Sequence, residues 1–215
     1  MTKKIIVLLG LPGSGKGTQG ALLSEELVIP HISTGDVFRK MVLEDSEDSK
    51  TLAACMKEGR LVPTGLVNKT IRKYILSDEC RDGCILDGYP RTLDQAEYFI
   101  ENIDATVNVI FFDLESDVVV KRILGRISCS SCGRIYNEHF DKPKKKGVCD
   151  NCGSEEFSAR SDDTESAILS RIAEYEKETL PMVEYYQKKG RFFTVNAGKS
   201  KQKVVEEIAS IVKKI

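Results

Sequence analysis

A glycine-rich segment near the start of the chain carries the clearest chemical signal in the sequence. It reads G-L-P-G-S-G-K-G-T and runs from Gly10 to Thr18. Glycines let the backbone turn tightly and point successive N–H groups inward, which makes a concave anion site at the start of a helix. Lys16 adds a mobile cation that can follow charge on the β- and γ-phosphates of a nucleoside triphosphate. The segment therefore predicts a phosphate-binding loop rather than an ordinary glycine-rich turn.

One position of this loop departs from the usual G-x-x-x-x-G-K-[ST] pattern. Gly17 stands where a serine or threonine would offer its hydroxyl to Mg²⁺, and Thr18 follows one residue late. The departure disfavours a GTPase or a motor ATPase, and favours a kinase that holds Mg²⁺ through phosphates, waters and a strand-end carboxylate. Asp87 and Asp113 both end apolar runs, so either could be that carboxylate. The D-G-Y-P-R context favours Asp87.

Arginines occur where a second phosphorylated substrate could be held. A phosphate acceptor is already ionised near neutral pH, because its second pKa is about 6, so transfer to it needs charge neutralisation rather than a general base. Arginine suits this role because its guanidinium is planar and permanently charged. Arg91 lies in D-G-Y-P-R-T at a strand terminus, where α/β ligand sites form. The other candidates are Arg39, Arg122, Arg126, Arg160 and Arg171.

The only histidines of the sequence are His31 and His139, and neither lies in a recognisable nucleophile or acid–base motif. We interpret both as structural residues. A hydrolase built on histidine is therefore disfavoured.

Four of the seven cysteines have the spacing of a metal site. Cys129 and Cys132 form one C-x-x-C, and Cys149 and Cys152 form another. This pattern predicts a tetrahedral Cys₄ zinc site, which leaves no open position and is therefore structural. Two disulfides or buried thiols are the alternative. A nucleic-acid-binding zinc ribbon is disfavoured, because interleaved aromatic residues and a basic net charge are lacking.

We expect alternating strands and helices to position these groups. Apolar runs predict buried strands at 4–9, 84–86 and 107–112, with a further strand near 192–195. A first helix should open near Lys16 and carry Leu22, Leu23 and Leu27 on one side. Pro181 should kink the long helix in which it lies. Further helical patterns lie at about 35–45, 49–58, 64–78, 93–101, 116–126, 163–188 and from 201.

This alternation predicts an α/β fold with a parallel sheet, interrupted by two insertions. Residues 33–62 are helical without a strand, and the segment from about 126 to 162 holds four cysteines, few apolar residues and several lysines. The remaining cysteines, Cys55, Cys80 and Cys84, have no metal-ligand spacing and should be buried as small apolar residues.

Composition limits the choice of partners and compartment. The chain has 215 residues, 41% of them hydrophobic and 30% charged, and a formal net charge of −1. The charge gives no general attraction to nucleic acid or to an anionic membrane surface. The first apolar run is too short for a signal peptide, and no stretch suits a transmembrane helix. We therefore expect a cytoplasmic protein whose cysteines are reduced.

Four ordered motifs together resemble the adenylate kinase family in its long-lid form. They are G-x-P-G-x-G-K-G-T at 10–18, S-T-G-D-x-x-R at 33–39, L-D-G-Y-P-R-T at 86–92 followed by Gln95, and G-R with C-x-x-C at 125–132. The resemblance covers essentially the whole chain. It implies a P-loop core formed by 1–32, 63–125 and 163–215, an AMP-binding insertion at 33–62 and a zinc-bearing lid at 126–162.

The resemblance also implies roles for individual residues. Those implied to contact ATP are Gly13, Ser14, Gly15, Lys16, Gly17, Thr18, Arg122, Arg126, Ile135, Tyr136 and Lys199. Those implied to contact AMP are Thr34, Arg39, Arg60, Leu61, Val62, Gly88, Tyr89, Pro90, Arg91, Gln95, Arg160 and Arg171. The catalytic group would be Lys16, Arg91, Arg126, Arg160 and Arg171, with Asp87 reaching Mg²⁺ through water.

The activity implied is reversible transfer of the terminal phosphoryl group of MgATP to AMP, giving two ADP and maintaining adenine nucleotide balance. Mg²⁺ and structural zinc would be the metals, the nucleotides would be the only partners, and a monomer is expected. A kinase for another nucleoside monophosphate is the nearest alternative. A P-loop switch or interaction protein, with the zinc lobe as a docking module, is the alternative from another class.

Overall fold

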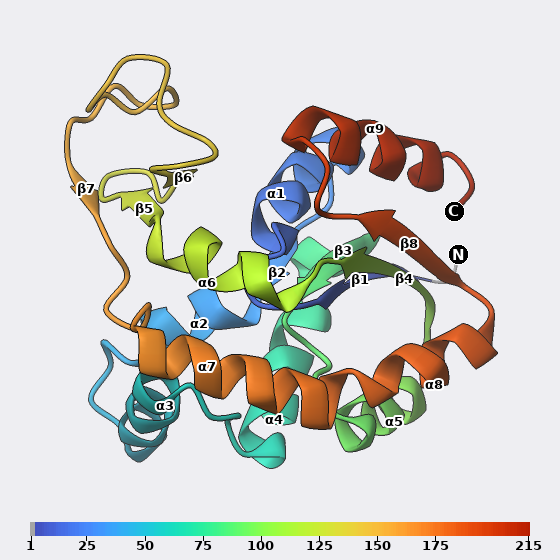
Figure 1. The fold of residues 1–215 in the computed structure, drawn as a ribbon. Helices are drawn as coiled ribbons and strands as arrows, with labels where there is room; N and C mark the ends of the chain where they lie inside the picture. The colour runs from blue at the N-terminus through green and yellow to red at the C-terminus, as the bar shows by residue number, and fades with distance from the viewer. Residues whose placement is uncertain (1–2) are drawn as a thin grey trace.

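A computed structural model describes residues 3–215. The centre of the molecule is a five-stranded parallel sheet. The strand order is β2-β3-β1-β4-β8, and every neighbouring pair is parallel (Figure 1). The strands are β1 (Lys3–Gly10), β2 (His31–Ser33), β3 (Gly83–Asp87), β4 (Ala105–Asp113) and β8 (Phe192–Asn196). The predicted α/β fold is confirmed. Residues 1 and 2 of the predicted core segment 1–32 lie outside the described residues.

Both faces of the sheet are covered, which explains why the central strand is a continuous apolar run. Ile5, Val7 and Leu9 point into the larger core cluster. Ile6 and Leu8 point into a second cluster on the other face. A strand that is buried on both sides loses the alternation of polar and apolar residues that a half-exposed strand shows.

Helices pack on each face, close to the predicted positions. Helices α1 and α9 cover one face, and α4, α5 and α8 lie on the other (Figure 1). None of the helices in residues 3–215 is long and apolar enough to cross a membrane. The helices are α1 (Lys16–Leu27), α2 (Thr34–Met41), α3 (Glu47–Glu58), α4 (Thr64–Ile75), α5 (Leu93–Asn102), α6 (Ser116–Leu124), α7 (Glu165–Glu174), α8 (Pro181–Lys189) and α9 (Lys201–Val212), with a 3₁₀ turn at Asp78–Cys80.

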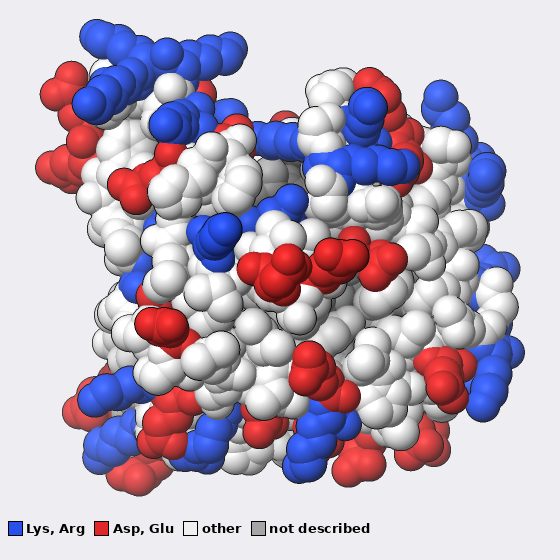
Figure 2. Space-filling model, in the orientation of Figure 1, with Lys and Arg blue, Asp and Glu red and all other residues white. Residues whose placement is uncertain are grey.

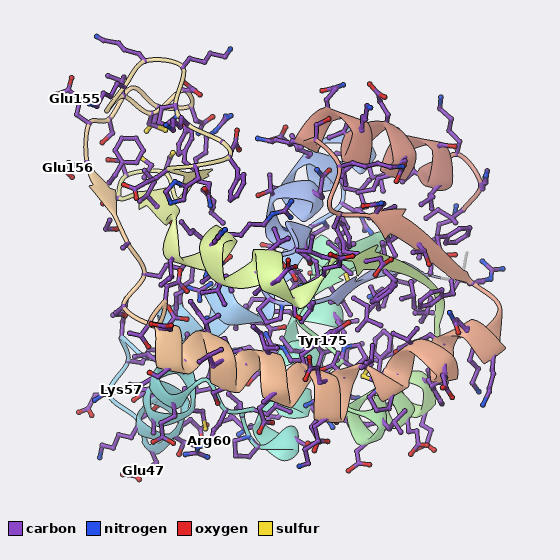
Figure 3. All side chains as sticks on the ribbon, viewed as in Figure 1. Glu47, Lys57, Arg60, Glu155, Glu156 and Tyr175 are labelled. Atoms are coloured by element: carbon purple, nitrogen blue, oxygen red, sulfur yellow. The ribbon has the colours of Figure 1, made fainter. Side chains whose placement is uncertain are left out.

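The long helix predicted at 163–188 is interrupted, as its proline suggested. A π-helical turn, Tyr175–Thr179, separates α7 from α8, and Leu180 N donates to Tyr175 O at 2.8 Å. Pro181 begins α8, where its missing N–H donor costs least. Tyr175 lies on the inner side of this helical stretch and is buried (Figure 3).

In the first third of the chain one expectation was wrong and one strand was missed. Leu22 does not share the buried side of α1 with Leu23, because 39% of its surface is exposed while Leu23 is buried. Strand β2 was not predicted at all. It is three residues long and pairs only with β3, so its hydrogen bonds come from a distant segment and leave little local pattern.

The segment 126–162 forms a separate small sheet that stands off from the main one (Figure 1). Its antiparallel strands are β5 (Arg126–Cys129), β6 (Ile135–Asn137) and β7 (Phe157–Ser158), in the order β6-β5-β7. We call this segment the lid. Its core contains only Ile127, Tyr136 and Phe157 beside Cys129 and Cys149.

The end of α1 suggests a stabilising substitution. Val28 follows the last helical residue in a left-handed conformation, with φ 54° and ψ 41°, and 88% of it is exposed. A β-branched residue is strained there, and glycine is the usual choice. We expect Val28→Gly to raise the free energy of unfolding by about 1 kcal/mol in urea denaturation. Val28→Ala is the control and should gain less. Equal or lower stability of the glycine variant would contradict this assignment of strain.

Candidate active site

A cleft of about 650 Å³ lies at the carboxyl ends of β1 and β3. In an open α/β sheet this edge is the usual place for a ligand. The glycine-rich loop forms its floor, and residues of the 33–62 segment, the lid and the 197–201 segment line its sides. Every residue predicted to contact nucleotide lines the cleft except Tyr89. The fold therefore brings together groups that are far apart in the sequence.

The loop has the concave form that its glycines predicted. Gly13 and Gly15 have φ of 76° and 95°, and a Cβ on Gly13 would lie 2.8 Å from Ile123. The ammonium of Lys16 donates to Gly10 O and to Leu11 O, both at 2.7 Å. Burial lowers the pKa of Lys16 to about 8, although Asp87 opposes the shift. The buried ammonium ion is therefore destabilised, and a bound anion would favour its charged form.

The unusual Gly17 has a structural reason. A Cβ at this position would lie 3.3 Å from Asp87 Oδ2, so the missing side chain leaves room for that carboxylate. Burial by itself would raise the pKa of Asp87, but the neighbouring His31, Lys16 and Arg91 outweigh it and hold the pKa below its usual range. The alternative carboxylate, Asp113, is exposed and is not part of the lining of the cleft.

His31 lies closer to this chemistry than its sequence context indicated. Its Nε2 is 3.8 Å from Asp87 Oδ2, which is too long for a hydrogen bond but close enough for a charge interaction. The ring packs on Gly20, where a Cβ would lie 2.5 Å from Nε2. His31 therefore borders the candidate metal carboxylate. The sequence offered one signal, its position two residues before the S-T-G-D motif.

The candidate arginines converge on the cleft and are paired with carboxylates. Arg126 binds Asp163 with Nε to Oδ2 at 2.7 Å, and Arg171 binds Asp162 with Nη2 to Oδ2 at 2.5 Å. Asp162 also lies 3.6 Å from Arg39. These two aspartates are buried and were missed by the sequence analysis. Their only signal is that they follow two and three residues after Arg160, in R-S-D-D.

Another carboxylate joins the two inserted segments. Asp36 Oδ1 is 2.5 Å from Arg39 Nη2 and 3.7 Å from Arg160 Nη2. Burial and, to a lesser extent, the nearby charges of Arg126 and Arg39 together lower the pKa of Arg160 to about 10. Four arginines and three aspartates thus form one network across the cleft. Like charges are tolerated there because each arginine has an acidic neighbour.

The loop after β3 holds Arg91 and a buried glutamine. The side-chain Oε1 of Gln95 accepts a hydrogen bond from Arg91 N at 2.8 Å, and Arg91 Nε donates to Gly88 O at 3.0 Å. Thr34 Oγ1 donates to Asp87 O at 3.0 Å, which ties α2 to the same strand end. Tyr89 is buried behind this loop rather than in the cleft.

The lid contributes an aromatic face that was not predicted. Phe140 is 59% exposed and lines the cleft, and its ring centroid lies 5.9 Å from the guanidinium carbon of Arg122. The predicted Tyr136 is different, because its side chain is buried in the lid and its hydroxyl accepts from Asp150 N at 2.7 Å. Lys199 lines the cleft and forms an ion pair with Glu207.

The four lid cysteines come together at one point. Their sulfur atoms lie within 4.8 Å of one another, with Cys129 to Cys152 and Cys132 to Cys149 each at 3.6 Å. These distances are too long for disulfide bonds and are close to the roughly 3.8 Å edge of a tetrahedron of thiolates around zinc. Equivalent turns support both pairs, because Gly133 and Gly153 have φ of 74° and 75°.

Charged side chains surround this cluster. Figure 2 shows lysine and arginine side chains gathered over the outer end of the lid, where the run from Lys142 to Lys146 lies. Glu155 and Glu156 point outward at the left edge of the lid in this view (Figure 3). The basic groups can offset the net charge of −2 that four thiolates on one Zn²⁺ would carry.

Comparison with known proteins supports the interpretation of the cleft. The model of the family described as adenylate kinase matches residues 8–191. An adenylate kinase of Rickettsia africae is 43% identical over 209 residues, which cover 97% of this chain and 99% of the relative. Those of Rickettsia rickettsii and Rickettsia typhi are each 42% identical with the same coverage. The chain belongs to the adenylate kinase family.

Proposed function

We propose that this cleft transfers the terminal phosphoryl group of MgATP to AMP, reversibly, and that it does so with the residues described above. Phosphoryl transfer between ATP and AMP is the reaction of the family to which the chain belongs. The observation that carries the assignment of residues is the arginine network. It faces the phosphate loop across one cleft, as two anionic substrates would require.

The donor nucleotide is assigned to the side of the cleft between the loop and the lid. The backbone of Gly13 to Thr18 would hold its phosphates at the start of α1. Arg122 and the exposed ring of Phe140 offer flat faces on which a base can stack. Mg²⁺ bound with the triphosphate would neutralise part of its charge, and Asp87, whose Oδ2 lies beside Gly17 of the loop, could hold its water shell.

The acceptor nucleotide is assigned to the side formed by the 33–62 segment. Arg39 and Arg91 would bind its phosphate, and Thr34 and Gln95 would face its base, with further contacts from Arg60, Leu61 and Val62. Tyr89 is buried and lies outside the lining of the cleft, so we assign it a role in supporting the loop that holds Arg91 and no contact with AMP. We propose domain limits of 33–62 for this segment and 126–162 for the lid.

Catalysis in this arrangement consists of positioning and charge neutralisation. The acceptor phosphate is already anionic, so no base has to remove a proton. Lys16, Arg91, Arg126, Arg160 and Arg171 would surround the group that moves and stabilise the charge on its oxygens. Closing the lid would exclude water, which otherwise competes as the phosphoryl acceptor.

The carboxylates explain how the arginines remain ordered before substrate binds. Asp36, Asp162 and Asp163 form ion pairs with the guanidinium groups to which the substrate phosphates would bind. Each arginine then exchanges one anionic partner for another and does not lose a partner. This exchange keeps the desolvation cost of substrate binding low.

We propose that the lid metal is structural zinc and that the protein is a cytoplasmic monomer that maintains adenine nucleotide balance. None of the seven cysteines, all of which lie in the described part of the chain, forms a disulfide bond, which is consistent with a reducing compartment. The small lid core supports the metal assignment, because three apolar residues beside two cysteines are too few to stabilise an independent sheet.

The activity is tested by offering MgATP with each nucleoside monophosphate in turn and following diphosphate formation. We expect AMP to be the acceptor, because Thr34 and Gln95 are assigned to its base and the chain belongs to the adenylate kinase family. Equal or faster reaction with another monophosphate would favour the nearest alternative, a different nucleoside monophosphate kinase. Nucleotide binding with no acceptor-dependent reaction would favour a switch protein and contradict the enzyme assignment.

The metal-side carboxylate is tested with Asp87→Asn and Asp113→Asn. Each residue is the last of a strand that flanks β1, Asp87 of β3 and Asp113 of β4, so they form a matched pair. We expect the first variant to lose about a hundredfold in kcat and to require more Mg²⁺ for half-maximal rate. The second should stay close to wild type because Asp113 lies outside the cleft. A larger loss at Asp113 would overturn the assignment.

Removal of the lid metal should lower thermal stability. We expect a chelated sample, or Cys132→Ser, to melt at least about 5 °C lower than the zinc-loaded protein, since the lid has little apolar core. Ser131→Ala is the control. Ser131 lies between Cys129 and Cys132, and the substitution removes only its hydroxyl, which bonds the Ser154 hydroxyl at 2.9 Å. An unchanged melting temperature after complete chelation would contradict a stabilising metal.

A further inference from the structure

A second depression lies away from the cleft, between α4 and α5. Its volume is about 490 Å³, and six residues line it: Gly65, Asn68, Lys69, Arg72, Lys73 and Tyr98. None of the six is acidic. The two helices lie side by side below the sheet, on the face opposite α9 (Figure 1). The family reaction uses none of these residues in the arrangement proposed above.

The three cations occupy one stripe of α4. Lys69, Arg72 and Lys73 are spaced i, i+3 and i+4, so their side chains leave the helix on the same face. Across residues 3–215, no carboxylate lies within ion-pair distance of any of them. Gly65 lies one turn before Lys69, and a Cβ there would meet nothing within 4 Å. The missing side chain leaves the depression open toward the cations.

A buried amide distinguishes this depression from an ordinary solvated helix face. Asn68 is only 7% exposed, yet it lines the depression. Its Oδ1 accepts from Tyr89 OH at 2.9 Å. In the described part of the chain its Nδ2 has no protein acceptor, so it remains available as a donor to a bound anion. A largely buried donor beside three unpaired cations is a site for an acceptor-rich ligand.

We propose that this depression binds an oligophosphate anion and that binding is communicated to the AMP phosphate loop. The volume exceeds the need of a single phosphate, and the cations are spread over one helical turn, which suits several linked anionic groups. The connection runs through Tyr89, whose hydroxyl bonds Asn68 and whose backbone adjoins Pro90 and Arg91. Gln95 then holds Arg91 N at 2.8 Å.

The binding claim is tested by titrating ¹⁵N-labelled full-length protein with inorganic pyrophosphate, without Mg²⁺ and at constant ionic strength. Amide signals of α4 are followed separately from those of the loop Gly10–Thr18. We expect saturable shifts at α4 with a dissociation constant of about 1 mM, since each exposed ion pair contributes little. Non-saturable shifts at α4, or none, would overturn the site. Shifts of the Gly10–Thr18 amide signals report pyrophosphate binding at the phosphate loop. The α4 site is judged from the α4 signals alone.

Charge-matched variants separate a site from general attraction. Lys69→Gln with Arg72→Gln should weaken pyrophosphate binding at α4 by at least about tenfold. Lys203→Gln with Lys213→Gln removes two exposed charges from the opposite side of the sheet and should leave the affinity unchanged. Equal affinities in the two double variants would show non-specific attraction and overturn the proposal.

The communication claim has its own readout. The AMP dissociation constant is measured with and without pyrophosphate, in the wild type and in the α4 double variant. Competition of pyrophosphate in the cleft is common to both proteins, so a difference between them reports the α4 site. Pyrophosphate changes the AMP dissociation constant by some factor in each protein. We expect this factor to be about fivefold larger in the wild type than in the α4 double variant. Identical effects in both proteins would refute the link through Asn68 and Tyr89.

Discussion

The structure depends on holding several positive charges close together in one partly buried cleft. Arg160 shows the electrostatic cost of this clustering, because burial and the charges of Arg126 and Arg39 lower its pKa to about 10. Lys16 shows it as well, with a pKa lowered to about 8 chiefly by burial. Such a cluster is stable only where opposite charges are close. The main sheet supplies Asp87 at the end of β3, and the segments outside the sheet supply the other carboxylates.

Those carboxylates also connect the segments outside the main sheet to one another. Asp36 belongs to the 33–62 segment and contacts Arg160, which stands at the end of the lid. Asp162 and Asp163 follow just before α7 and hold Arg126 at the start of the lid and Arg171 on α7. A phosphate that displaces one of these carboxylates therefore changes a contact between two segments. In the proposed function, the same ion pairs would couple occupancy of the cleft to the position of the lid.

The sequence was sufficient for the parts of the site that local patterns encode. The glycine-rich loop, Arg91 in its strand-end motif and the paired cysteines each depend on residues within a few positions of one another, and strand β1 is visible as one apolar run. Asp163 was missed because its partner Arg126 is 37 residues away, and Asp36 appeared only as part of the S-T-G-D motif. His31 and Phe140 were missed for the same reason: only tertiary packing makes them neighbours of Asp87 and Arg122.

The lid shows how a segment with little core can still act as one body. Tyr136 links its two halves, because the ring packs with Phe157 at 5.7 Å between centroids while the hydroxyl reaches Cys149 and Asp150. The cysteine cluster thus braces the same aromatic residue that anchors β6, and β6 carries Ile135 to the cleft. The ends of the lid are held by ion pairs of Arg126 and Arg160. The metal proposed for the four cysteines would be closed to substrate, but it would still contribute to function by keeping the cleft-facing residues of the lid in fixed register.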